Sequence, residues 1–192
     1  MTKISFTPGS WENAGLNYAY SWRFPELPTF VQEPDCIVNS EAPGTPQEFD
    51  YMGLFAPDTY SVGTKLSVRC SFEDLGAPML VISPTNEIDE NGILRTLDYY
   101  ELVIWKNGLN VWHLHTEDRN VTYYKVLGAT FPLTEHDIHT LSVEIRQNRL
   151  LLQVDDRKLE LFVHDLPDTF LLGYNACEGI CRLYDITVEE PA

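Results

Sequence analysis

Two stretches of the chain carry residues that could do chemistry, and the first is the acidic run PTNEIDENGI at 84–93. Glu87, Asp89 and Glu90 fall within four positions of this run. Two carboxyl groups can hydrolyse a glycosidic bond if one stays protonated and, in retaining enzymes, the pair lies about 5–5.5 Å apart. Clustered carboxylates can instead hold Ca²⁺. The run is therefore a candidate for catalysis, for a cation site or for an acidic turn.

The residues around this run favour the turn. In a strand, Glu87 and Asp89 would point to one face and Glu90 to the other. Pro84 precedes the run and Asn91-Gly92 follows it, a composition that predicts a loop between two strands. A carboxyl group in a hydrated loop lacks the burial that would raise its pKa. We expect a solvated turn, and a weak cation site at the same three carboxylates is the alternative.

The second stretch, DYYELVIWKNGLNVWHLH at 98–115, predicts a β-hairpin because Asn-Gly pairs accept the positive φ angles of a tight turn. Pairing about Asn107-Gly108 would place Trp105 opposite Asn110 and Val103 opposite Trp112. Aromatic rings cover the C–H faces of a pyranose, and carboxylate and amide groups bind its hydroxyls. One face of the hairpin combines these groups and is our candidate ligand site: Tyr99, Glu101, Trp105, Asn110 and Trp112. The alternative is that this face fills the core of the protein.

The opposite face of the same hairpin offers a second candidate, formed by Tyr100, His113 and His115. Two imidazoles two residues apart in a strand point the same way and could chelate a metal. The sequence identifies no third ligand, so structural histidines are the favoured interpretation. Glu101 is the residue that would serve as acid or base if the protein were an enzyme, with His113 or another acid across the cleft.

The charge and hydropathy of the chain argue against several classes of function. Thirteen basic residues face 29 acidic ones, for a formal net charge of −16. Nucleic-acid and anionic membrane surfaces attract the opposite charge, so we expect neither partner. No apolar run is long enough for a membrane span, and the N-terminus lacks a signal-peptide pattern. We expect a cytoplasmic protein, or a secreted one if a signal has been lost. No cofactor motif appears, and calcium is the one ion left open.

The four cysteines do not suggest a metal site. Cys177 and Cys181 are separated by three residues, which is not a zinc-knuckle spacing, and no second close pair accompanies them. Cys36 and Cys70 lie in apolar, strand-like runs, where a free thiol behaves as a small hydrophobe. We expect buried thiols, with a Cys177–Cys181 disulfide as the alternative.

Short alternating runs separated by turn residues dominate the chain and predict an all-β antiparallel sandwich forming a single domain over residues 1–192. Residues 139–163 should form a meander of three strands, with Leu141, Val143 and Ile145 on its dry face. The expected strands are 3–7, 15–22, 35–40, 50–56, 65–73, 78–83, 98–105, 109–116, 121–127, 139–147, 149–155, 158–163, 169–175 and 180–189.

The last third of the chain resembles the concanavalin A-like lectin/glucanase superfamily, including its laminin-G-type domains. The matching elements are His139, Val154-Asp155-Asp156, Leu172-Gly173 and Gly179-Ile180 with Tyr184-Asp185-Ile186. The resemblance implies a jelly roll of two curved sheets with a concave face or rim that often holds sugar. Laminarinase-like glycosidases of this superfamily carry an E-I-D-x-x-E run, but here Glu90 follows Asp89 directly. The catalytic pattern is therefore not reproduced.

Three hypotheses follow. The first is non-catalytic binding of an oligo- or polysaccharide through the concave face or rim. The second is a glycoside hydrolase or lyase that uses Glu101 as acid or base. The third is a protein-interaction scaffold whose aromatic surface meets another protein. The sequence does not determine the glycan or the oligomeric state.

Overall fold

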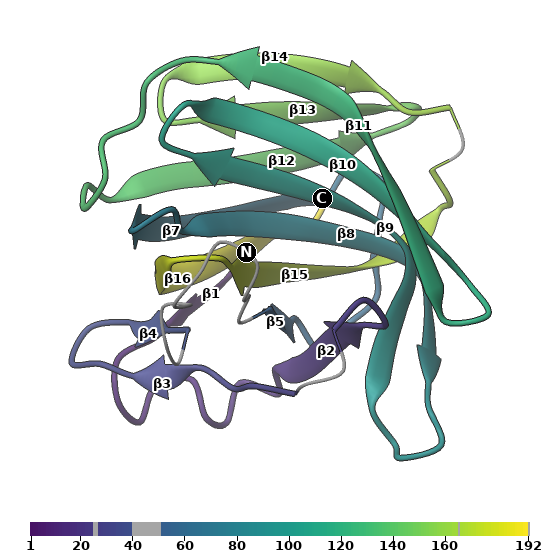
Figure 1. Ribbon diagram of the computed structural model, residues 1–192, viewed down its shortest axis with the longest axis horizontal. Coiled ribbons are helices and arrows are strands. Elements are labelled where there is room, and N and C mark those ends of the chain that lie inside the picture. Colours follow the sequence, from purple (N-terminus) through teal and green to yellow (C-terminus); the bar gives the residue numbers. More distant parts are fainter. Residues whose placement is uncertain (25–26, 40–50, 165, 192) are drawn as a thin grey trace.

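The computed structural model describes residues 1–24, 27–39, 51–164 and 166–191, which form strands, turns and loops but no helix (Figure 1). Within these ranges, accordingly, no helix is long and apolar enough to cross a membrane. The strands make two facing sheets, as the alternating sequence pattern predicts for an antiparallel sandwich. The first sheet runs in the order β14 (Arg157–Phe162), β13 (Arg149–Val154), β12 (His139–Arg146), β7 (Lys65–Glu73), β16 (Ile180–Glu189), β4 (Ile37–Val38) and β3 (Val31–Gln32), with β1 (Thr2–Ser5) also on β16.

The second sheet carries the predicted hairpin. Its neighbouring strands are β11 (Asn120–Thr130), β10 (Gly108–Glu117), β9 (Leu94–Trp105), β8 (Ala77–Ile88), β15 (Thr169–Cys177), β5 (Met52–Phe55) and β2 (Asn17–Ser21), and β6 (Tyr60–Ser61) pairs with β15. The meander β12–β13–β14 is confirmed. The strands β3 and β6 were not predicted, because two residues carry no alternation to detect. Ser142 lies on the face predicted to be wet but is buried.

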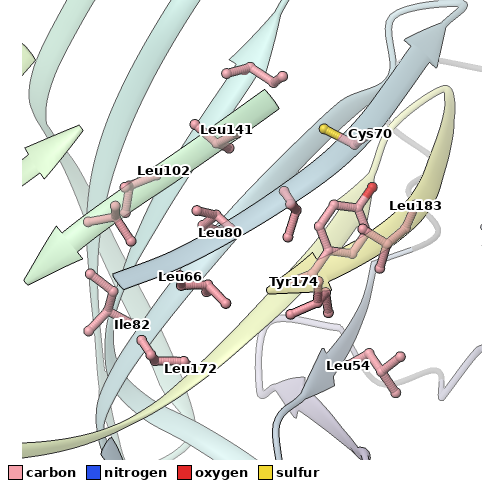
Figure 2. Packing of buried hydrophobic residues seen from close by; sticks show 14 of the residues in the cluster. Leu54, Leu66, Cys70, Leu80, Ile82, Leu102, Leu141, Leu172, Tyr174 and Leu183 are labelled. Carbon is pink, nitrogen blue, oxygen red and sulfur yellow. The ribbon is translucent and has the colours of Figure 1, made fainter. Parts of the chain in front are cut away.

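The main core lies between the sheets. Side chains that point inward from β8, β9 and β15 meet those from β7, β12 and β16 (Figure 2). Figure 2 shows Leu80, Leu102 and Leu172 from the second sheet packed near Leu66 and Leu141 from the first. All five side chains are shielded from water, and each buried aliphatic side chain stabilises the fold by about 1.5–3 kcal/mol.

The four cysteines are free thiols, as the sequence predicts. Cys36, Cys70 and Cys181 are buried, and Cys177 is partly buried. Burial raises the pKa of the Cys181 thiol to about 12, so this side chain stays protonated at neutral pH and packs as a small apolar group.

The predicted loop over 84–93 is wrong in extent. The structure continues β8 to Ile88 and begins β9 at Leu94, so the turn is restricted to five residues. Pro84, which has no N–H to donate, lies where the ladder between β8 and β9 is irregular, because its register shifts on either side of Thr85. Gly92, with φ of 80°, supplies the left-handed residue of the turn. The two strands therefore form a long hairpin that projects beyond the rest of the sheet (Figure 1).

The hairpin 98–115 forms, but its predicted register is off by two residues. Trp105 pairs with Gly108, Asn110 with Val103 and Trp112 with Glu101, so the turn residues are Lys106 and Asn107. The backbone N–H groups of Phe131 and Leu133 donate to the carbonyl oxygens of Asn107 and Lys106, which holds the turn in this register. A shift of two residues preserves the facing of every side chain, so the two predicted faces of the hairpin are unaffected.

The second sheet also curls over itself. β2 pairs in parallel with the start of β9 and antiparallel with β5, and β5, β15, β8 and β9 complete a closed ring of five strands. A second, smaller hydrophobic cluster fills this ring, with Phe55, Val81 and Tyr99 at its centre. The ring covers one end of the outer face of this sheet, the face turned away from the main core, and leaves the other end uncovered by β2 and β5.

Candidate functional site

A cavity of about 400 Å³, here called the first cavity, lies at the uncovered end of this outer face. Its floor consists of side chains that point away from the main core: Met79 on β8, Glu101 and Val103 on β9, and Asn110 and Trp112 on β10. They share one side of the sheet because successive residues of a strand alternate between its two faces. The rest of the lining comes from Arg23, Phe24, Tyr51, Phe72, Leu75, Gly76, Ala77, Trp105, Lys106, Leu114, Tyr123, Glu135, Cys177 and Glu178.

Four of the five residues predicted on this face of the hairpin line the cavity. Trp105, Asn110 and Trp112 are partly buried, and Glu101 is 5% exposed. Tyr99 is the exception, because it lies inside the five-strand ring, where its hydroxyl donates to Ser21 Oγ at 2.7 Å. The ring therefore removes Tyr99 from the surface that a ligand could reach.

Glu101 is held by a hydrogen-bond chain that the local sequence does not reveal. Asn175 Nδ2 donates to the Tyr51 hydroxyl at 2.7 Å, and that hydroxyl in turn donates to Glu101 Oε1. Burial raises the pKa of Glu101 from 4.5 to about 7. The hydrogen bond from Tyr51 and the positive charge of Arg23 oppose this shift but do not cancel it. The floor of the cavity thus holds a carboxyl group poised between its protonated and ionised forms near neutral pH.

The wall of the cavity is a stack of aromatic rings and a cation. The rings of Phe24 and Tyr51 stack with centroids 4.6 Å apart. The Arg23 guanidinium lies 5.1 Å from the Phe24 ring centroid and 4.6 Å from that of Tyr123. Tyr123 then meets Trp112 edge to face at 5.9 Å. These contacts hold several flat apolar surfaces around the carboxyl group.

A second carboxyl group, Glu178, reaches the cavity from the turn between β15 and β16, where its φ of 62° is left-handed. Burial raises the pKa of Glu178, and the charge of Arg23 opposes the rise. The Cys177 thiol beside it is also shifted to a higher pKa, first by burial and then by the nearby charge of Glu101. Sequence reasoning missed Glu178, Arg23 and Tyr51 because each lies far along the chain from the hairpin.

The acidic run does not enter the first cavity. Trp22 Nε1 donates to Glu87 at 2.9 Å. Asp89 is buried and accepts hydrogen bonds from Arg95 Nε and from the backbone N–H groups of Asn91 and Ile93 at 2.9–3.0 Å. Burial would raise the pKa of Asp89, but these hydrogen bonds and the charge of Arg95 outweigh it and lower the pKa. Asp89 therefore stabilises the turn in its ionised form.

Glu90, the third carboxylate of the run, binds a different partner. Both of its carboxylate oxygens accept from Arg119 Nη2, at 2.8 and 2.7 Å, which joins the tip of β8–β9 to the tip of β10–β11. Arg119 and Arg95 both lie over the Trp22 ring, at 4.4 and 4.5 Å from its centroid. The three carboxylates are thus directed to three separate partners. Over the described ranges, no three His, Cys, Asp or Glu side chains come together as a metal site would require.

The structure separates the two predicted histidines from the first cavity. His113 and Tyr100 lie on the opposite face of the sheet, with parallel rings 4.3 Å apart. His115 is exposed, and its Nδ1 lies 3.9 Å from Asp98 Oδ2. His113 therefore cannot act with Glu101 across one cleft, and Glu135 and Glu178 are the other acids that line the cavity with Glu101. His139, in the resembling third of the chain, contacts Asp155 and the Thr134 carbonyl at 2.9 Å and supports the start of β12.

Comparison with known proteins gives a fold. No family model and no curated protein sequence matches the chain. Among solved structures, the carbohydrate-binding module CBM66 from Bacillus subtilis is similar with a TM-score of 0.66 and 11% identity, over 92% of this chain and 96% of the module. The Bacillus licheniformis beta-glucanase is similar with a TM-score of 0.65 and 11% identity, over 99% of this chain and 98% of that one.

A GlcNAcα1-4Gal-releasing endo-β-galactosidase from Clostridium perfringens is similar with a TM-score of 0.65 and 10% identity, over 98% of this chain and 62% of its own. At such identities the likeness concerns the backbone alone, and fold does not determine function. The resemblance inferred from the last third of the sequence nevertheless extends, in three dimensions, over nearly the whole chain. The protein has the concanavalin A-like jelly-roll sandwich fold.

Proposed function

We propose that this protein binds glycans through the first cavity, without cleaving them. The observation that carries the proposal is the composition of the cavity floor and wall. Glu101 and Asn110 offer carboxyl and amide groups for sugar hydroxyls, and the Trp112 ring lies beside them. Apolar ring faces with a few convergent polar groups are the general form of a small-molecule site, and about 400 Å³ is within its usual size.

The proposal is supported by the way the polar groups are held. The Tyr51 and Asn175 side chains fix the Glu101 carboxyl before any ligand arrives, so little conformational entropy is lost on binding. The likeness to a carbohydrate-binding module of nearly equal length is consistent with the same use of the fold.

Isothermal titration against a panel of plant, host and bacterial oligosaccharides tests the proposal. At least one glycan should bind saturably at millimolar concentration or tighter. Its affinity should fall about tenfold or more in Trp112→Ala, as expected for the loss of an aromatic ring that stacks on the ligand. Phe162→Ala is the matched control, because Phe162 is an exposed aromatic on β14 and does not line the cavity. The absence of heat from the whole panel would contradict glycan binding.

Glycoside hydrolysis is a second candidate, favoured by one specific observation. Glu101 and Glu178 line the same cavity, and burial raises the pKa of both. A carboxyl group with a pKa near 7 could donate a proton to a leaving group while a second carboxylate acts as nucleophile or base. Reducing-end release from polysaccharides, lost in both Glu101→Gln and Glu178→Gln, would establish it. Full activity of Glu101→Gln would remove Glu101 from the mechanism.

The third hypothesis, a protein-interaction scaffold, predicts that the rings around the first cavity are covered by another chain. A stable dimer in solution whose formation shields Trp105 and Trp112 from a fluorescence quencher would favour it over glycan binding. A monomer with both rings accessible would count against it.

A further inference from the structure

A second cavity, of about 550 Å³, opens on the other face of β10. Its walls come from β8 to β11 on one side and from β14 and the segment that follows on the other, so it lies between the two sheets at one side of the sandwich. Trp112 and His113 are neighbours in the chain, but strand alternation sends Trp112 to the first cavity and His113 to the second. The second cavity is therefore separate from the proposed glycan site.

Aromatic rings form two of its walls at nearly a right angle. The Tyr100 and His113 rings are parallel within 6°, and the Tyr124 ring is inclined to His113 at 74° with centroids 5.1 Å apart. Tyr124 is 55% exposed, and Phe162, on the opposite side, is 67% exposed. Exposed apolar side chains that gather on one hollow are a common feature of ligand-binding sites.

The charge in the second cavity comes from Asp98. His113 Nε2 donates to Asp98 Oδ1 at 2.5 Å, since a carboxylate can only accept, and His113 Nδ1 and the Tyr124 hydroxyl share a hydrogen bond at 2.5 Å. Asp98 Oδ2 lies 3.9 Å from His115 Nδ1, beyond hydrogen-bond distance. Among the described residues that line the cavity there is no lysine or arginine and no other carboxylate. The basic side chains of the described lining are His113 and His164, so the cavity carries one carboxylate and no permanent cation, which suits a cation better than an anion.

We propose that the second cavity binds a methylated organic ammonium ion. The faces of aromatic rings attract such a cation, and the attraction strengthens when the site is partly dry. Asp98 supplies the matching negative charge, and the net charge of −16 draws cations toward the protein as a whole. The walls provide ring faces rather than several converging acceptors, so the geometry suits methyl groups on nitrogen better than the N–H donors of a primary amine.

The probe is choline, with the uncharged isostere 3,3-dimethylbutan-1-ol beside it, followed by NMR of ¹³C-labelled methyl groups. The methyl signals of Val126, Leu161 and Val163, which line the second cavity, should shift saturably with choline at millimolar concentration. The isostere should bind about tenfold more weakly, because it lacks the charge. Asp98→Asn keeps an oxygen for His113 and should weaken choline binding about tenfold, and Phe162→Ala about fivefold.

Trp112→Ala, in the first cavity, is the matched control and should leave choline affinity unchanged. The proposal is overturned if the isostere binds as tightly as choline, if choline produces no saturable shift of these methyl groups, or if glucose shifts them more strongly than choline does. It is also overturned if neither Asp98→Asn nor Phe162→Ala weakens binding. Because Phe162 is exposed, its variant should fold, and together with the isostere it decides the question even if Asp98→Asn is unstable.

Discussion

Replacing Glu101 by glutamine should change how stability depends on pH. The carboxyl group is 5% exposed, and burial raises its pKa from 4.5 to about 7 in the folded protein. In the unfolded chain the pKa returns to about 4.5. The folded state therefore holds this proton more tightly than the unfolded state, and the free energy of unfolding falls as pH rises from about 4.5 through about 7. The difference of about 2.5 pH units corresponds to about 3 kcal/mol.

Urea unfolding of the wild type and of Glu101→Gln at several pH values between 4.5 and 8 measures this effect. Glutamine keeps an oxygen that accepts the hydrogen bond from Tyr51 but has no proton to release. Relative to the wild type, the variant should therefore gain about 3 kcal/mol of unfolding free energy between pH 4.5 and pH 8. Glu117→Gln, at an exposed position outside both cavities, controls for the loss of one negative charge from an acidic protein.

Stability curves of wild type and Glu101→Gln that stay parallel across this pH range would refute the reasoning. They would mean that the carboxyl group is well hydrated in the folded protein. A wild-type stability that rises with pH relative to the variant would contradict the direction of the pKa shift itself. It would mean that Tyr51 and Arg23 lower the pKa of Glu101 by more than burial raises it.

Three further predictions concern the elements that position the site. Gly108→Ala should lower the free energy of unfolding by more than about 1 kcal/mol in urea titrations, because φ is 134° and the added Cβ would lie 2.0 Å from a backbone carbonyl oxygen of β11. His139→Ala should cost about 2–3 kcal/mol by the same assay, because it removes a buried ring that contacts Asp155 and a backbone carbonyl. Arg119→Ala should cost less than about 1 kcal/mol, because its ion pair with Glu90 is exposed, and a larger loss would show that the joined hairpin tips hold the fold together.

Strand alternation explains why the sequence predicts much of the site correctly. Glu101, Trp105, Asn110 and Trp112 share a face in any antiparallel register, because a slip by two residues returns each side chain to the same side. The register itself was predicted wrongly because the Asn-Gly pair is not the centre of the turn. Backbone hydrogen bonds from the segment after β11 to Lys106 and Asn107 decide it, and these contacts are remote in sequence.

The part of the site that could not be predicted depends on long-range pairing. Tyr99 is buried because β2 pairs in parallel with β9, and these segments are 75 residues apart, as in the pair Ala19 and Leu94, so no local sequence pattern predicts the contact. Tyr51 directly precedes β5 and Glu178 lies in the turn between β15 and β16, and the ring of five strands brings them to the cavity. The acidic run at 84–93, by contrast, was a candidate for catalysis or cation binding in the sequence. Its carboxylates bind a tryptophan, two arginines and turn N–H groups, which are interactions that composition alone does not reveal.

The central claim is that ligands meet the protein at the first cavity, and two methionine methyl groups test it most directly. Met79 lies on the floor of this cavity, whereas Met52 lies in the main core between the sheets. In a protein labelled with ¹³C at the methionine methyl groups, titration with the glycan panel should shift the Met79 signal saturably and leave the Met52 signal in place. A Met79 signal that no glycan moves at millimolar concentration, or a bound glycan that moves other methyl groups but not Met79, would contradict the account.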